Sequence, residues 1–525
     1  MNRFLCVILF SIVPIILFSQ KKADNRPRLV VVLMVDDLNA DQLFTWQEKF
    51  EKGGINRMMN QGTLIPRVSY NTTSTYVGAS VATFYSGATP AVHGIISSQW
   101  MDRFSQVPTD ALYGPDFKTV PDSLLKPSTN MLLVTTLTDE LRRLYPNYSK
   151  IRGIGLNDHI MNWAIGHGGD GYYSVDIKTG LISNKQNKEV PFWVREFNSK
   201  KFPEIYKMRE WGPINNINDY YESKFHRSRL TENFLYRFNE DTDYRRLIYS
   251  PYGNVMIRDF AASMIINEGL GKDEYPDLLT ISLSLKPRVI KNSKPMDAEV
   301  EDMAIRLDHE ITGLIRLFEE TIGMENVLMI LTGAHNPGIF PDDYKTLGAP
   351  TGSFSGKKAL SLLNLYFMAQ YGQEKWALSY NDGAFYLNTQ LIESKGMSVK
   401  EMRSKAADFL IQMSGVARTH TYDQLINEKK LMIDEVIYQS FHAKRSGDVL
   451  IELEPGWVEE LDDGELRSRP SLNRDLPVIF FGGQIPAGTI QKPYQMIDIA
   501  PTICTLLKIS YPNGCVGKPI ESLVK

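Results

Sequence analysis

The sequence predicts a doubly wound α/β fold with a mostly parallel central sheet. The run 29–35 is continuously hydrophobic, and 277–284 and 326–332 are rich in apolar residues, as strands buried on both faces are. Between the last two runs, apolar residues recur every three or four positions over 299–322, which predicts a helix. A strand, a helix and a second strand in this order form a right-handed crossover between parallel strands.

The first predicted strand ends in two acidic residues, Asp36 and Asp37. Open α/β sheets bind their ligands at the carboxyl ends of their parallel strands, so we expect the site at this edge. Neighbouring residues of a strand point to opposite faces, so we do not expect both carboxylates to reach one ligand.

The other elements follow from the same periodicities and from Gly and Pro breaks. They are a helix over 41–61 broken at Gly53-Gly54, a helix over 79–86, a helix over 131–144, a strand over 150–156, a helix over 399–413, a strand over 476–481 and a helix over 496–507. Two segments are predicted as insertions. Residues 192–254 are aromatic and charged and are expected to cap the carboxyl edge, and the second insertion covers 341–455.

Composition and the first residues indicate an exported globular protein. A net charge of −3 gives no electrostatic case for a nucleic-acid partner. Residues 1–20 have the layout of a signal peptide, with Arg3 before an apolar run over 4–18 that is short for a membrane span. We therefore predict one domain over 21–525 without a transmembrane segment, located in the periplasm or cell envelope.

Export leaves two cysteines in the mature chain, Cys504 and Cys515. An oxidising compartment permits a disulfide between them. Two separate buried thiols fit the sequence equally well, because a spacing along the chain does not fix the geometry of the two side chains.

Several motifs, spread over essentially all the mature chain, resemble the alkaline phosphatase superfamily. They are Val35-Asp36, Tyr85-Ser86-Gly87, the segment 90–95 (Pro-Ala-Val-His-Gly-Ile), Asp277-Leu278-Leu279, Leu331-Thr332, the segment 444–450, the segment 454–457 and Asp498-Ile499-Ala500-Pro501-Thr502. The chain is most similar to the exported phosphate-irrepressible alkaline phosphatases and the nucleotide pyrophosphatases/phosphodiesterases. The resemblance implies the alkaline phosphatase fold, and it implies a structural role for His93 in its turn.

The resemblance also implies a site with two zinc ions, Asp and His ligands, and a Thr or Ser that attacks phosphorus. Asp36 falls on the first metal aspartate, and His335 falls on a metal histidine. At the other matched positions the side chain differs from the one that the family uses. Val77 stands in place of the nucleophile, Asn157 and His159 in place of a phosphate-binding Lys and Arg, Pro287 and Lys291 in place of a metal-binding Asp and His, and Ala334 in place of a metal-binding Asp. The last metal histidine has no counterpart, because 464–475 contains no His.

Two retained ligands are fewer than zinc sites use. From this loss we predict a catalytically degenerate protein without a cofactor, which acts as a binding or scaffold subunit for an unknown envelope protein. The alternative is a metal-dependent phosphomonoesterase or phosphodiesterase, with zinc at a rebuilt site and Thr75 or Ser80 as nucleophile. A second alternative is a receptor that binds a phosphorylated ligand without turnover.

Overall fold

The computed structural model describes residues 26–70, 72–121, 124–186, 189–220, 234–287, 297–335, 348, 350–427, 434–461, 464, 466–468 and 475–524. The predicted signal peptide lies outside these residues and stays a prediction. Among the described helices, none combines the length and the apolar character needed to cross a membrane.

The fold is organised around a large central sheet with β1 (Leu29–Asp36) in its middle. The strand order is β20 (Gly488–Thr489), β2 (Thr63–Ser69), β19 (Asp475–Phe481), β11 (Val327–His335), β1, β10 (Asp277–Ser284), β5 (Ile151–Gly155), β6 (Tyr172–Val175) and β7 (Ile182–Asn184), with β21 (Tyr494–Gln495) beside β2. Strands β11, β1, β10, β5 and β6 are parallel, whereas β19 and β7 run against their neighbours. The predicted fold class is confirmed.

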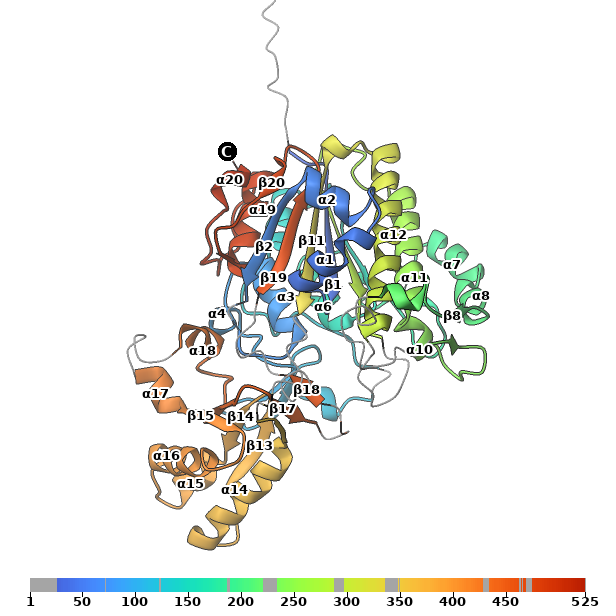
Figure 1. The fold of residues 1–525 in the computed structure, drawn as a ribbon. Coiled ribbons are helices and arrows are strands. Elements are labelled where there is room, and N and C mark those ends of the chain that lie inside the picture. Colours follow the sequence, from blue (N-terminus) through green and yellow to red (C-terminus); the bar gives the residue numbers. More distant parts are fainter. Residues whose placement is uncertain are drawn as a thin grey trace, which may run out of the picture.

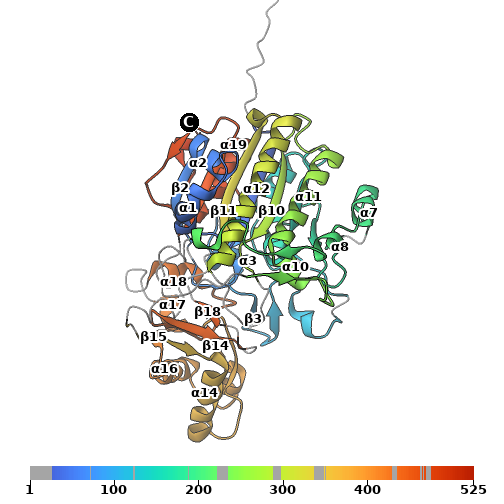
Figure 2. The ribbon, with the colours of Figure 1, turned by 45° about the vertical axis from the view of Figure 1, so that its right-hand side comes forward.

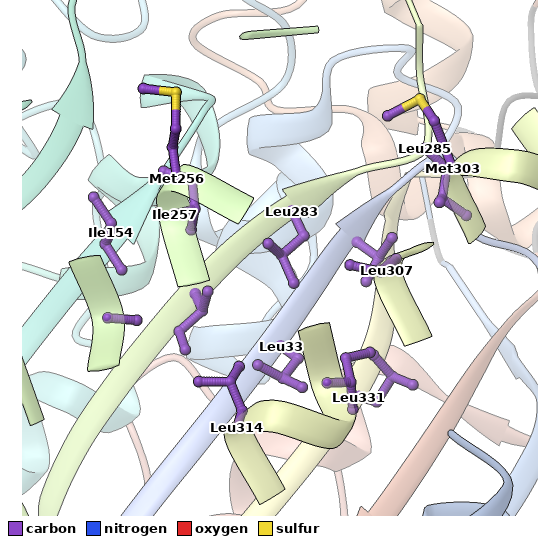
Figure 3. Close-up of a cluster of buried hydrophobic side chains, with 14 of the residues drawn as sticks. Leu33, Ile154, Met256, Ile257, Leu283, Leu285, Met303, Leu307, Leu314 and Leu331 are labelled. Atoms are coloured by element: carbon purple, nitrogen blue, oxygen red, sulfur yellow. The ribbon is translucent and has the colours of Figure 1, made fainter. Parts of the chain in front are cut away.

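Helices cover both faces of this sheet (Figures 1 and 2). Alternate residues of β1 point to opposite faces, so Leu33 and Val32 enter different cores. On one face Leu33 lies among side chains of α11 (Pro251–Glu268) and α12 (Asp297–Thr321), as Figure 3 shows. The other face is covered by α3 (Val77–Ser86), α6 (Asp158–Ile165) and α19 (Ile499–Leu507).

Shorter elements complete this part of the chain. They are α1 (Ala40–Trp46), α2 (Ile55–Gln61), α4 (Pro90–His93), β3 (Gln99–Met101), β4 (Pro108–Asp110), α5 (Leu137–Leu144) and α20 (Glu521–Val524). The helix expected over 131–144 is shorter than predicted. It begins only after Thr136, because the hydroxyl of Thr136 accepts from the backbone N–H of Asp139 and caps the helix there.

The first insertion lies elsewhere than expected. Its elements are α7 (Phe192–Ser199), α8 (Phe202–Lys207), β8 (Glu210–Trp211), β9 (Tyr236–Arg237) and α10 (Arg245–Ile248). They pack beside α11 and α12 rather than over the carboxyl edge (Figures 1 and 2). The ring of Trp193 is 5.0 Å from that of Phe260 on α11, and Trp211 donates to Asp302 on α12 at 2.7 Å. The aromatic residues thus extend the core on this face of the sheet.

The second insertion forms a lobe with its own core, which we call the second lobe (350–427 and 434–453). It contains β12 (Gly352–Phe354), α14 (Gly356–Tyr371), β13 (Ala377–Asn381), β14 (Ala384–Leu387), α15 (Thr389–Ser394), α16 (Val399–Leu410), β15 (Val416–Thr421), α17 (Tyr422–Asn427), α18 (Glu435–Ser440) and β16 (Val449–Leu453). Its main sheet has the order β13-β14-β16-β15, and β12 pairs with β17 (Trp457–Glu460), which pairs with β18 (Leu466–Ser468). Figure 1 shows this lobe below the central sheet.

A buried ion-pair network joins the second lobe to the main body. The carboxylate of Asp448 accepts from Arg103 of the main body and from Arg403 of α16, both at 2.8 Å. It also accepts from the backbone N–H of Leu387 at 2.8 Å, and Asp448 is only 3% exposed. One buried carboxylate therefore neutralises two arginines at the junction.

We expect Asp448→Ala to lower the free energy of unfolding by about 3–5 kcal/mol, because it leaves the largely buried Arg103 without its counter-charge and leaves Arg403 with Asp423 alone. Urea unfolding measures this loss. The matched control is Glu374→Ala, whose 3.0 Å pair with Lys395 is exposed, with 42% and 47% of the two side chains accessible. That variant should change stability by less than about 1 kcal/mol. Equal losses in both variants would contradict the role assigned to Asp448.

Candidate functional site

The carboxyl edge of the central sheet gathers segments from distant parts of the sequence. Asp36 ends β1 and pairs in register with Ser284 at the end of β10 and with His335 at the end of β11. Strand β2 runs in the same direction as β1, because β19 is antiparallel both to β11 and to β2. The residues that follow β2 therefore leave the sheet at the edge where Asp36 lies, and they include Thr75.

The two acidic residues after β1 differ in their surroundings. Asp37 has a left-handed backbone (φ 64°), and its carboxylate lies 3.8 Å from the ammonium group of Lys286. The backbone carbonyl of Asp36 accepts from Leu285 at 3.0 Å, which continues the pairing of β1 with β10. The carboxylate of Asp37 is thus directed to Lys286, and whether both carboxylates reach one ligand stays a prediction.

Thr75, two residues before α3, has the most developed polar surroundings at this edge. Its hydroxyl oxygen lies 2.8 Å from Oδ1 of Asp382 and accepts from the guanidinium of Arg467 at 3.0 Å. Its backbone N–H donates to Oδ2 of Asp382 at 3.2 Å, and the hydroxyl of Ser74 donates to the same oxygen at 2.6 Å. The side chain of Thr75 is buried.

Asp382 reaches Thr75 from the second lobe, through the turn of the β13–β14 hairpin. Asn381 pairs with Ala384, so Asp382 and Gly383 form a two-residue loop. Both have positive φ angles, 46° and 81°. Asp-Gly is a favoured sequence for such a turn, because Gly carries no Cβ and Asp tolerates this backbone better than most residues. The turn therefore fixes the carboxylate at the tip of the hairpin.

Tyr76, next to Thr75, is held by two side chains of α6. Its hydroxyl accepts from the indole N–H of Trp163 at 3.2 Å and lies 2.9 Å from Nδ1 of His159. The indole can only donate, so the oxygen of Tyr76 accepts from Trp163 and keeps a proton and a second lone pair for its contact with His159. Burial lowers the pKa of His159 and so favours the neutral imidazole. Asn157 caps α6 by accepting from the backbone N–H of His159 at 2.9 Å.

The remaining residues that the resemblance assigned take structural places where they are described. Val77 is the first residue of α3 and is half-buried, and Ser80 is buried within the same helix. Pro287 and Ala334 are buried, while Lys291 lies outside the described residues. Whether these positions mark lost functions stays a prediction.

The described side chains do not fit a complete zinc site. Across the described ranges, three or more His, Cys, Asp or Glu side chains do not gather into a group that could hold a metal ion. Asp36 and His335 are adjacent in register, and this pair alone falls short of the three or four protein ligands of zinc sites.

The two cysteines form no disulfide. Cys504 is buried in α19, Cys515 is half-buried, and both are free thiols. The thiol of Cys515 is turned to the backbone carbonyl of Gly517 at 3.9 Å. Burial raises the pKa of both thiols, so both stay protonated. The structure thus has the two separate thiols that the sequence left open, and the expected bridge is absent from it.

His93 is a structural residue, as the resemblance implied. Its Nδ1 accepts from the backbone N–H of Ile95 at 3.0 Å, and its Nε2 lies 3.1 Å from the hydroxyl of Thr83. That hydroxyl donates to the carbonyl of Ala79 at 2.9 Å, so Nε2 of His93 must carry the proton. The pKa of His93 is lowered to about 3. Complete burial of the ring is the main cause, and the nearby positive charge of Arg445 adds to it.

Sequence reasoning did not assign Asp382 or Arg467 to the site. The signal for Asp382 was present, because an Asn-Asp-Gly run separates two strand-like runs, 377–380 and 384–387. That pattern predicts a hairpin turn, but it does not predict which residues the turn contacts in space. Arg467 lies in β18 and carried no comparable signal.

Nearly the whole chain is similar to a phosphodiesterase family and to proteins named alkaline phosphatases. The family model for type I phosphodiesterase / nucleotide pyrophosphatase matches residues 30–471. Alkaline phosphatase PhoV of Synechococcus elongatus is 30% identical over 95% of this chain and 93% of its own length. A protein of Myroides odoratus named calcium-transporting ATPase is 28% identical over 95% of both chains. The crystal structure of wild-type alkaline phosphatase PafA superposes with a TM-score of 0.86 at 26% identity, and the match covers 95% of this chain and 99% of that one.

These similarities contradict two expectations drawn from the aligned positions. A degenerate scaffold subunit is the wrong interpretation, because proteins named alkaline phosphatases match this chain over nearly its full length. The expectation that no cofactor is needed is contradicted by the same matches, because the resemblance to alkaline phosphatases that they support implies metal-dependent enzymes. Both expectations rested on matching single positions, which does not consider the contacts that side chains make in space.

We expect His93 to make the protein less stable as the pH falls. Between the unfolded pKa near 6.5 and the folded value of about 3, the unfolded state binds one more proton. The free energy of unfolding therefore drops by about 1.4 kcal/mol for each pH unit in this window. Urea unfolding of the wild type and of His93→Gln, at about pH 7 and pH 5, should show a loss smaller by about 2 kcal/mol in the variant. Equal losses would mean that His93 is not held neutral.

Proposed function

Because the chain belongs to the type I phosphodiesterase / nucleotide pyrophosphatase family, we propose that it hydrolyses phosphate esters with Thr75 as nucleophile. The observation that carries this proposal is the contact between the Thr75 hydroxyl and the guanidinium of Arg467, at the carboxyl edge of the sheet. A nucleophilic hydroxyl beside a cation suits attack on an anionic ester, because the cation offsets the repulsion between oxygen and phosphate. Ser80, the other candidate, lies inside α3.

The proposed reaction has two displacements at phosphorus. The oxygen of Thr75 forms a bond to phosphorus while the bond to the leaving oxygen breaks, which releases an alcohol and leaves a phosphothreonine. Water then attacks the phosphothreonine, releases inorganic phosphate and restores the hydroxyl. The guanidinium of Arg467 donates to the nucleophilic oxygen, and its fork of N–H groups matches phosphoryl oxygens.

We also propose that the active protein uses zinc, with Asp36 and His335 among its ligands. Similarity to alkaline phosphatases supports the metal, and the register of β1 with β11 supports the pairing of these two residues. Zinc, when bound, supplies Lewis-acid stabilisation of phosphoryl oxygens. Because the described residues do not complete its ligand set, the steps above use only groups of this chain.

Export to the periplasm or cell envelope is part of the proposal and rests on residues 1–20, which lie outside the described residues. Binding of an envelope protein by this chain also stays a prediction.

Turnover of 4-nitrophenyl phosphate, bis(4-nitrophenyl) phosphate and ATP tests the activity and separates monoesters, diesters and anhydrides. We expect Thr75→Ala to lower kcat at least about a thousandfold, because it removes the attacking oxygen. Ser80→Ala is the matched control and should keep kcat within about twofold. Loss of activity in Ser80→Ala alone, with both variants folded by circular dichroism, would assign the nucleophile to Ser80 instead.

Elemental analysis after dialysis against trace zinc tests the cofactor. We expect bound zinc in the wild type and at least a tenfold weaker affinity in Asp36→Ala, because a ligand is lost. Asp37→Ala is the neighbouring control and should keep its zinc, since Asp37 faces Lys286. Full turnover by a zinc-free protein in the presence of a chelator would contradict this part of the proposal.

A further inference from the structure

We propose that Asp382 of the second lobe is the general base that takes the proton from Thr75. This inference rests on the proposed function, because it assigns the activation of the nucleophile named there. It adds that the activating group comes from an inserted lobe rather than from the edge of the central sheet.

The position of the hydroxyl proton follows from the partners of Thr75. A guanidinium can only donate, so the oxygen of Thr75 accepts from Arg467 at 3.0 Å. The single hydroxyl proton must therefore point to its other partner, Oδ1 of Asp382, at 2.8 Å. This is the arrangement that general-base catalysis requires, with the base within hydrogen-bond reach of the proton that it abstracts.

The two oxygens of Asp382 have different tasks. Oδ2 accepts from the hydroxyl of Ser74 at 2.6 Å and from the backbone N–H of Thr75 at 3.2 Å. These two donors orient the carboxylate and direct Oδ1 to the Thr75 hydroxyl. The Asp-Gly turn fixes the backbone of Asp382 at the tip of the hairpin, so both ends of the side chain are held. A carboxylate placed in this way loses little freedom when it accepts a proton.

The proton and the electrons balance in each step. As the oxygen of Thr75 bonds to phosphorus, its proton passes to Oδ1 of Asp382, and the electron pair of the breaking P–O bond stays with the leaving oxygen. The protonated Asp382 then returns the proton to the leaving alkoxide or to solvent. In the second displacement the attacking water releases a proton to solvent, and Asp382, protonated again from solvent, gives its proton to the Thr75 oxygen as the bond between that oxygen and phosphorus breaks. No oxidant or further co-reactant is consumed.

The decisive variant is Asp382→Asn, which removes the basic oxygen but keeps an acceptor and suits the same turn. The probe is 4-nitrophenyl phosphate, whose leaving group departs without needing a proton, so the assay reports the attack by Thr75. Rapid-quench measurement of phosphothreonine formation should show a rate lower by about 10²–10⁴-fold. Inhibition by inorganic phosphate should stay within about threefold of wild type, because the proposed phosphate contact of Arg467 remains.

Two controls separate a base from a structural residue. Asp176→Asn removes a carboxylate from another turn, where Asp176 accepts from the N–H groups of Lys178 and Thr179, and should leave the rate unchanged. Asp382→Glu keeps a carboxylate and should recover part of the rate that Asp382→Asn loses. This recovery would not occur if Asp382 served only to shape the turn, because Glu fits that turn less well than Asn.

The outcomes distinguish this inference from the proposed function. If the wild type turns over and Thr75→Ala is inactive, but Asp382→Asn forms phosphothreonine at the wild-type rate, the function stands and the base role is overturned. If Asp382→Asn loses phosphate binding and rate in parallel, Asp382 is structural and the inference is likewise overturned. If the wild type hydrolyses none of the three substrates with zinc present, the proposed function and this inference both fail.

Discussion

Burial of β1 on both faces is the constraint on which the rest of the structure depends. Its side chains alternate between two cores, one built with α11 and α12 and the other with α3, α6 and α19. A strand that is apolar on both faces is stable only when helices cover both sides, which requires parallel neighbours joined by crossovers. The carboxyl ends of those neighbours then meet at one edge. The position of Asp36, and of the site, follows from the hydrophobic core.

The two insertions contribute to the molecule in different ways. The first is aromatic and adds to the core over α11 and α12, where Trp211 is tied to Asp302. The second has a core and sheet of its own, and the buried carboxylate of Asp448 fixes it to the main body. That attachment determines where the β13–β14 turn lies, and so it holds Asp382 against Thr75. The hydroxyl of Thr75 is polarised by the carboxylate of Asp382 and by the guanidinium of Arg467. This arrangement forms only where distant parts of the chain meet.

The aligned positions and the observed contacts give different accounts of the site. An ungapped count from Gly87 arrives at Val77, which begins α3 and cannot attack phosphorus. The hydroxyl with a carboxylate and a guanidinium beside it belongs to Thr75, two residues earlier. Such a displacement is small along the chain, since Val77 begins α3 and Thr75 lies two residues before it. The partners of a side chain are a better guide to its chemistry than its place in a count, because reactivity depends on neighbouring charge and hydrogen bonds.

The sequence by itself determined the fold class, the central strand and the edge of the sheet that carries Asp36. These follow from hydrophobic periodicity and chain order, which are local properties and survive in any correct fold. The break of the helix at Gly53-Gly54 and the structural role of His93 could also be predicted. Only the tertiary structure decided that Asp382 and Arg467 meet Thr75, that the first insertion covers α11 and α12, and that the two cysteines stay apart. Each of these depends on contacts between residues far apart in the chain, and the packing of separately formed elements fixes such contacts.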